Sequence, residues 1–254
     1  MTPTFSHKDL YFLMLIMDTE ILIGFSNPFE GKSHHEISLE WKKTREKLDQ
    51  LQLLKISGED VQMEEQFQNA LWIMSRTNLV VEIVKDGLKK SYFYFSRQNV
   101  VECAQMENGE YTLYMHSTPE VTWNDVIYPR MLTGVEERRI RTNDKIYISP
   151  TEYNKWVKEN RMEHTSEDSL TFLRQAFSQK IHNHRIMLFH KGDTEWKIEG
   201  LHVLTSPEGN WVLKMINKDG VELLEGKQST NIGILSDILA LLQTIMENQQ
   251  TIAK

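Results

Sequence analysis

The chain has 254 residues, of which 40% are hydrophobic and 26% charged, and its formal net charge is −7. This length suits one large domain or two small ones, and the composition is typical of globular proteins. The acidic balance argues against a general binder of nucleic acid or acidic membranes, because phosphate groups select clustered Lys and Arg. The single cysteine, Cys103, excludes an internal disulfide and a Cys-rich metal site, which fits a reducing cytoplasm.

The N-terminal part of the chain is predicted to be helical. The apolar run at 10–17 is too short to span a bilayer and has acidic residues on both sides. It lacks the basic start of a signal peptide, so we expect a buried helix from Ser6 to Met17 with Ser6 as its N-cap. Hydrophobic periodicity predicts the next elements, which are a possible short strand at Ile21–Phe25 and helices at Leu39–Leu54 and Met63–Ser75.

After these helices the pattern changes to short apolar runs, which predict a series of strands. Asp86-Gly87 and Asn108-Gly109 are typical hairpin turns, because glycine accepts a positive φ at little steric cost. Pro129 is expected to limit or kink the helix that follows the strands. The predicted elements are strands at Leu79–Val84, Ser91–Phe95, Val100–Ala104 and Tyr111–Met115 and a helix at Val121–Met131.

The second half of the chain begins after a charged stretch at Thr133–Asp144, which we interpret as a solvated linker. Ser149-Pro150-Thr151-Glu152 is a capping box with proline at the first helical position, and it predicts a helix start. The elements predicted after it are a helix at Glu167–Gln179, strands at Arg185–His190, Glu195–Glu199, Leu201–Leu204 and Trp211–Ile216, a possible fifth strand at Val221–Leu224, and an amphipathic helix at Ile232–Met246.

The two halves repeat one order of elements: a helix, four apolar strands and a closing helix. The copies are predicted at 64–132 and 166–246, and Gly109–Met115 aligns with Gly209–Met215 at an offset of about one hundred residues. The fold class is therefore predicted to be α+β, with two pseudo-symmetric subdomains that each hold an antiparallel sheet and flanking helices. The expected division is residues 1–132, a linker at 133–148 and residues 149–254, with one compact domain as the alternative. Such a shape favours a binding platform over a single catalytic cleft.

Catalytic and metal-binding motifs are not found in the sequence. It contains neither the G-x-S-x-G elbow nor a glycine-rich phosphate loop, and Cys103 lies in a predicted strand without a histidine motif nearby. His182 and His184 lie at a predicted helix-to-strand junction, where neighbouring side chains tend to point apart, and His34-His35 lies in a predicted loop. We therefore predict no enzyme activity, no cofactor and no metal site.

Two interpretations remain for the aromatic and basic residues. Helix, helix and hairpin over Trp41–Phe95 give the outline of a winged-helix unit, with Lys89 and Lys90 on the wing, so a nucleic-acid-binding regulator is the alternative function. The second helix of that unit is acidic at its start, which disfavours DNA binding. Twelve Met and six Trp residues instead favour a protein-binding surface.

Several stretches carry a resemblance to a known family. A helical pair ends at Gln52–Gly58, Phe67–Met74 leads into Leu79–Val84, and Gly200–Thr205 and Gly209–Leu213 precede a closing Leu-rich helix. In this order and pattern the chain resembles the EspG-type chaperones of type VII (ESAT-six-like) secretion systems, including their counterparts in Gram-positive bacteria outside the mycobacteria. It departs from the mycobacterial members in its short loops and in having Lys, Asn and Ile where Ala, Gly and Arg are usual.

The resemblance implies a cytoplasmic, non-catalytic chaperone without a cofactor and without membrane insertion. Such a protein would hold the apolar tip of a helical-hairpin or toxin-like secreted substrate through its central sheet and the helices of the second half. Its oligomeric state stays open. From the pattern alone, the expected partner-binding residues are Met187, Phe189, Trp196 and Ile198.

Overall fold

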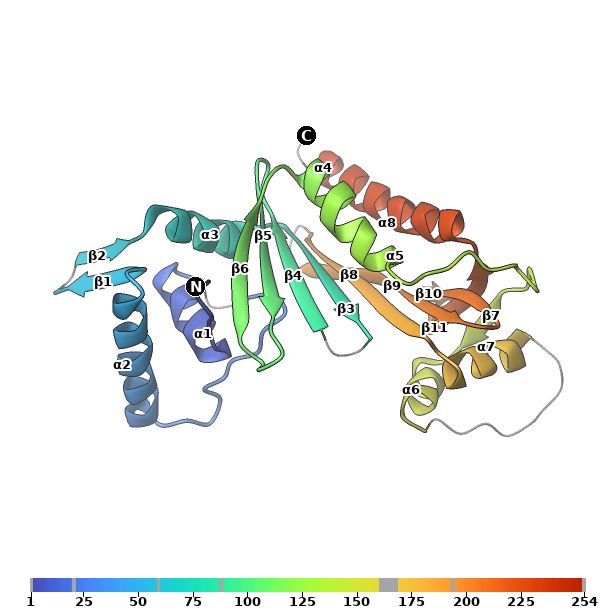
Figure 1. The fold of residues 1–254 in the computed structure, drawn as a ribbon, viewed down its shortest axis with the longest axis horizontal. Coiled ribbons are helices and arrows are strands. Elements are labelled where there is room, and N and C mark those ends of the chain that lie inside the picture. The colour runs from blue at the N-terminus through green and yellow to red at the C-terminus, as the bar shows by residue number, and fades with distance from the viewer. Residues whose placement is uncertain are drawn as a thin grey trace. The chain divides into compact units, whose positions relative to one another are not determined.

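The computed structural model describes residues 2–19, 22–58, 60–86, 89–159, 169–192 and 195–252 (Figure 1). The chain divides into two compact units, one made of residues 1–82 and 89–122 and the other of residues 83–88 and 123–254. Both units combine helices with antiparallel strands, so the predicted α+β class is confirmed. The finer division into halves at 1–132 and 149–254 stays a prediction.

The N-terminal helix of the first unit forms as predicted. Ser6 caps α1 (His7–Ile16), because its hydroxyl accepts from the backbone N–H of Asp9 while the Asp9 carboxylate accepts from the backbone N–H of Ser6. Asp9 is buried, and it also accepts hydrogen bonds from Lys47 Nζ and Thr44 Oγ1, both at 2.7 Å, on α2 (His34–Gln50). Burial alone would raise the pKa of Asp9, but these hydrogen bonds outweigh it and lower that pKa.

The region between α1 and the first sheet differs from prediction in three places. Helix α2 begins before the predicted residue 39, because Ser33 and Glu36 form a capping box. Residues 22–25 form a turn rather than a strand, and Ile21 lies outside the described residues. A hairpin that was not predicted precedes the next helix, and its side chains are mostly exposed. Its strands are β1 (Leu54–Ser57) and β2 (Asp60–Met63), and the helix is α3 (Glu65–Arg76).

The sheet of the first unit has the order β6-β5-β4-β3, and its strands match the predicted ones to within two residues. Aromatic side chains occupy both faces of its third strand, and all four are buried. On one face Tyr94 donates a hydrogen bond to the carbonyl of Ile23, and Phe25 packs on Tyr92. The strands are β3 (Leu79–Lys85), whose last three residues belong to the second unit, β4 (Lys89–Phe95), β5 (Val100–Gln105) and β6 (Tyr111–His116).

The helix predicted around Pro129 is present, and its middle is a π-helical segment. Proline has no N–H and its ring crowds the carbonyl four residues earlier, so the wider turn relieves the helix just before Pro129. The segments are α4 (Pro119–Thr122), η1 (Trp123–Ile127) and α5 (Tyr128–Leu132).

The second unit contains strands in the order β8-β9-β10-β11-β7, with the end of β3 beside β8. As predicted, the Ser149 hydroxyl accepts from the backbone N–H of Glu152 at the start of a helix. The elements are β7 (Ile146–Ile148), α6 (Pro150–Glu159), α7 (Ser169–Ser178), β8 (His182–Lys191), β9 (Trp196–Ser206), β10 (Gly209–Lys218), β11 (Val221–Ser229) and α8 (Asn231–Ile252).

The repeat of element order is confirmed, but the alignment that suggested it is wrong. The strands predicted at 195–199 and 201–204 are one strand, β9, which continues through Gly200. A Cβ atom at Gly200 would lie 2.4 Å from Met187 Sδ, so this glycine marks a close approach rather than a break. The fourth strand of the second unit is therefore β11. Consequently, Gly109–Met115 and Gly209–Met215 belong to the fourth and third strands of their units and are not equivalent.

The connector before β7 lies along the ends of β10 and β11 instead of being freely solvated. Asn210 Nδ2 donates to the carbonyl of Glu136 at 2.8 Å, and Asn231 Nδ2 donates to that of Val135 at 3.0 Å. The backbone N–H of Arg141 donates to Gln228 Oε1 at 2.6 Å. Three side-chain amides, of which those of Asn210 and Gln228 are buried, thus hold a backbone whose charged sequence predicts a solvated linker.

Candidate partner-binding surface

The sheet of the second unit has two differently covered faces. One face, here the α8 face, carries Lys227, whose Nζ pairs with Asp237 Oδ1 on α8 at 2.8 Å. The opposite face, here the α7 face, carries Trp211, Leu213 and Leu224, since side chains alternate along a strand. In Figure 1, α8 lies on one side of these strands, and α6 and α7 lie on the other.

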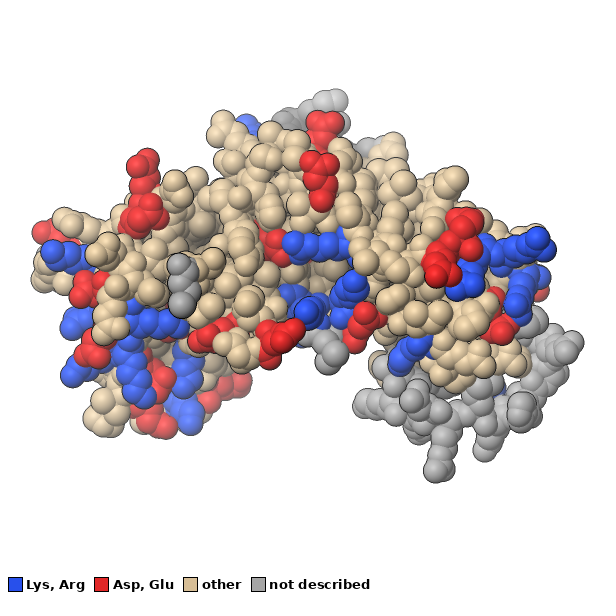
Figure 2. All heavy atoms as spheres, viewed as in Figure 1, with Lys and Arg blue, Asp and Glu red and all other residues tan. Residues whose placement is uncertain are grey.

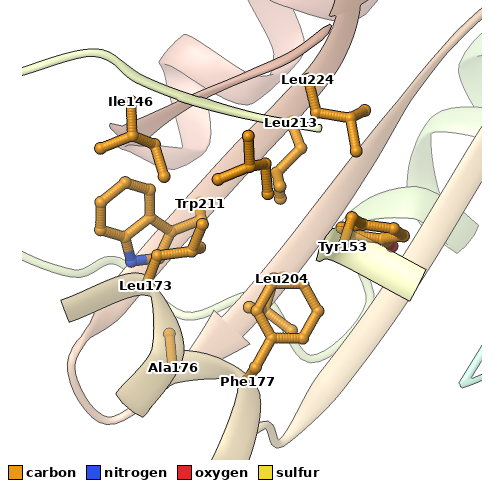
Figure 3. Close-up of a cluster of buried hydrophobic side chains, with 10 residues drawn as sticks. Ile146, Tyr153, Leu173, Ala176, Phe177, Leu204, Trp211, Leu213 and Leu224 are labelled. Atoms are coloured by element: carbon orange, nitrogen blue, oxygen red, sulfur yellow. The ribbon is translucent and has the colours of Figure 1, made fainter. Parts of the chain in front are cut away.

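Part of the α7 face is a closed core. Side chains from α6 and α7 pack there on the strands, and Trp211 and Leu213 have no exposed surface (Figure 3). The ring of Tyr153 on α6 meets the ring of Phe177 on α7 edge-on, with centroids 5.5 Å apart. The buried residues of this cluster are Ile146, Ile148, Tyr153, Leu173, Ala176, Phe177, Leu204, Trp211, Leu213 and Leu224.

A polar contact marks the border of this core. The Tyr153 hydroxyl lies 2.6 Å from His202 Nδ1. Burial raises the pKa of Tyr153 to about 12 and, with a smaller contribution from Arg185, lowers the pKa of His202 to about 4. Both partners are therefore neutral near pH 7, so the contact is a neutral hydrogen bond rather than an ion pair.

Beyond His202 the same face is mostly apolar, with Lys191 opposite Trp196 at its far end. Strand register places Phe189 opposite Ile198 and Met187 opposite Gly200, and Trp196 lies two residues before Ile198. All four residues predicted from the pattern therefore lie on the α7 face. We call this patch the apolar extension. It consists of Met187, Phe189, Trp196, Ile198 and Met215.

The apolar extension differs from the core in its exposure. Ile198 is 58% exposed and Met215 is 47% exposed, while Met187, Phe189 and Trp196 are half-buried. The Met187 side chain lies across Gly200, as the short distance from its Sδ to a Cβ built there indicates. A group of exposed apolar side chains on one sheet face is the kind of surface that contacts another molecule. Its role in binding stays a prediction.

Met215 was not among the predicted residues. It lies two residues after the buried Leu213 and opposite Leu224, so it shares their face. The alternation of Trp211, Leu213 and Met215 in the sequence was a signal that could have identified it.

The winged-helix interpretation does not fit the strand arrangement. A wing is a free hairpin, whereas β4 pairs along its length with β5, and β5 pairs with β6. Lys89 on the proposed wing and two lysines of α2, the first helix of the proposed unit, also have acidic partners. Figure 2 shows both signs of charge intermixed over α2. The ion pairs are Lys42–Glu46, Lys43–Glu40 and Lys89–Glu107.

Two side-chain groups that resemble catalytic sites lack the required geometry. Cys103 is buried, and burial raises the pKa of its thiol, which keeps it protonated. In the first unit Ser91 Oγ donates to Glu102 Oε1 at 2.9 Å, and His116 Nε2 lies 2.9 Å from Glu102 Oε2. Here the serine and the histidine both contact Glu102, whereas in a Ser-His-carboxylate triad the histidine lies between the other two groups.

Comparison with known proteins gives a likeness of fold. The sequence matches no protein-family model, and it matches no curated protein. Among solved structures the chain is similar to the Mycobacterium tuberculosis type VII secretion system chaperone EspG5, in a structure of its complex with the PE25–PPE41 dimer. The TM-score is 0.57 at 10% sequence identity, over 98% of this chain and 96% of that chain. The chain therefore has an EspG-like α+β fold.

Among the residues that the structure describes, no helix is both long enough and apolar enough to cross a membrane.

Proposed function

We propose that this protein is a non-catalytic cytoplasmic chaperone that binds a helical substrate of a type VII secretion system and keeps it soluble for secretion. We further propose that it is a counterpart, from Gram-positive bacteria outside the mycobacteria, of the EspG chaperones. The observation that carries the proposal is the apolar extension, where a buried sheet face continues into exposed side chains. The EspG-like fold supports it, because a solved protein of that fold is described as a type VII secretion chaperone.

The physical argument concerns what such a patch can cover. The apolar tip of a helical hairpin aggregates when it is left in water, and a flat sheet face can shield it. Full burial of a large apolar side chain is worth about 1.5–3 kcal/mol, and the five side chains together expose at most about two whole side chains, so covering them gives roughly 4 kcal/mol. A micromolar complex needs about 8 kcal/mol. We therefore expect the partner to contact the neighbouring helices α6 and α7 as well.

Co-expression tests this function. The chain should be produced together with each small helical protein encoded beside its own gene, and the soluble yield of that protein should be measured with and without the chain. We expect one of them to become soluble and to co-elute as a stoichiometric complex whose mass light scattering reports. If all of these proteins stay equally soluble without the chain and none co-elutes with it, the proposal is wrong.

A further inference from the structure

Three potential metal ligands meet where the end of β3 lies beside β8. Asp86, His182 and His184 each offer one ligand atom, and these atoms all lie within 4.8 Å of one another. The expectation that the two histidines point apart is wrong, because β8 begins at His182 rather than at residue 185. Residues two apart on a strand share a face, and the two rings lie 5.7 Å apart.

His184 is arranged as metal-binding histidines usually are. It is 1% exposed, and its Nδ1 lies 2.8 Å from the carbonyl oxygen of Met131 on α5. Because a carbonyl only accepts, Nδ1 carries the proton and donates, which leaves Nε2 with a free lone pair. Within the described part of the chain, this buried Nε2 has no hydrogen-bond partner. In metal sites a histidine typically donates one ring N–H to a backbone carbonyl. This bond fixes the tautomer of the ring and leaves the other nitrogen to bind the metal.

Asp86 is held in position by the strand that carries the histidines. Its backbone N–H donates to the carbonyl of Asn183 at 2.8 Å, and its Oδ1 accepts from the backbone N–H of Asn183 at 3.0 Å. Its Oδ2 lies 3.6 Å from His182 Nδ1. Two atoms bound to the same tetrahedral Zn²⁺ at about 2.0–2.1 Å are roughly 3.4 Å apart, so this pair is already near ligating distance.

The ring of His182 is fixed from its other side. A Cβ atom at Gly134 would lie 2.2 Å from His182 Nε2, so the ring rests directly on this glycine. Gly134 has a φ of 80°, which also favours glycine at this position. His182 Nδ1 is buried and makes no hydrogen bond to any described residue, so it can face an ion between the three side chains.

We propose that Asp86, His182 and His184 bind a divalent first-row transition-metal ion such as Zn²⁺, which fixes the turn after β3 to β8. Two imidazoles and one carboxylate suit this class of ion, and a water molecule would complete four-fold coordination. The other buried histidine of β8 provides a contrast. His190 Nε2 lies 3.5 Å from Glu199 Oε1, but no third ligand joins that pair among the described residues.

Metal titration of the full chain tests this proposal. The protein is treated with a chelator and titrated with Zn²⁺ in a calorimeter, and Co²⁺ absorption reports the ligand set. We expect one equivalent to bind and to raise the thermal unfolding midpoint. D86N keeps the hydrogen bond that Oδ1 accepts, and H182N changes a partly exposed ring, so both should fold. Each should weaken binding at least tenfold.

Asp219 supplies the matched control. Like Asp86 it has a positive φ (54°, against 52°) and precedes a glycine in the connection between two consecutive strands, but among the described residues it belongs to no group of three potential metal ligands. D219N should therefore bind Zn²⁺ as the unchanged chain does. The proposal is overturned if Zn²⁺ shows no saturable binding up to millimolar concentration. It is equally overturned if D86N and H182N, shown by circular dichroism to be folded, bind as tightly as D219N.

Discussion

Strands β4 and β9 belong to units with the same order of elements, yet their apolar side chains serve different purposes. Every aromatic residue at positions 92–95 of β4 is buried, on both faces of the strand. On the α7 face of β9, Leu204 is 1% exposed, whereas Ile198, nearer the start of the strand, is 58% exposed. In this protein a strand with many aromatic residues lies in the core. The exposed apolar surface instead continues a line of buried side chains along one face of a strand.

The largest expected effect is a difference in the free energy of unfolding between a variant in β4 and a variant in β9. F93A removes a ring with no exposed surface, and Phe→Ala changes in cores cost about 3–5 kcal/mol in the free energy of unfolding. I198A removes a mostly exposed side chain, and we expect it to cost less than about 1 kcal/mol. Urea unfolding of both variants measures the difference. Equal losses would mean that the apolar extension is part of the core.

A smaller effect is expected at the border between core and apolar extension. The folded-state pKa of His202, about 4, lies below its usual value of about 6.5, so the unfolded chain takes up the proton first as the pH falls. As the pH falls from about 6.5 to about 4, the cost of keeping His202 neutral should therefore progressively lower the free energy of unfolding. The loss is up to about 3 kcal/mol, and less to the extent that the ring meets solvent.

Comparison with H202N isolates this contribution, because carboxylates that titrate in the same range are common to both proteins. Urea unfolding at several pH values should give a flatter pH dependence for H202N than for the unchanged chain. Parallel pH profiles would show that burial does not hold His202 neutral, and that this border is open to water.

Much of the fold could be predicted from local sequence. Short apolar runs locate strands β3 to β6, and glycine turns separate β3 from β4 and β5 from β6. Ser6 and Ser149 mark helix starts through their side-chain hydrogen bonds. The hairpin β1–β2 was missed because most of its side chains are exposed and give no apolar pattern. Gly200 predicts a break between two strands, because the sequence does not show the methionine that lies across it.

The candidate surface could be predicted only in part. Alternation placed Met187, Phe189, Trp196 and Ile198 on one face, but their exposure depends on how far α6 and α7 cover that face, which is a tertiary property. The group formed by Asp86 and the two histidines was missed for a related reason. It depends on where β8 begins and on which turn lies beside it.

One measurement tests the central claim, that the apolar extension binds the partner, most directly. Ile198 and Val221 are 58% and 57% exposed on the same sheet, and strand alternation puts Val221 on the opposite face. The dissociation constants of I198D and V221D for the co-purified partner should be measured by calorimetry. We predict that I198D raises Kd at least tenfold, because it buries a charge, which costs more than about 1.4 kcal/mol, while V221D leaves Kd unchanged. Equal Kd values for the two variants would contradict the account.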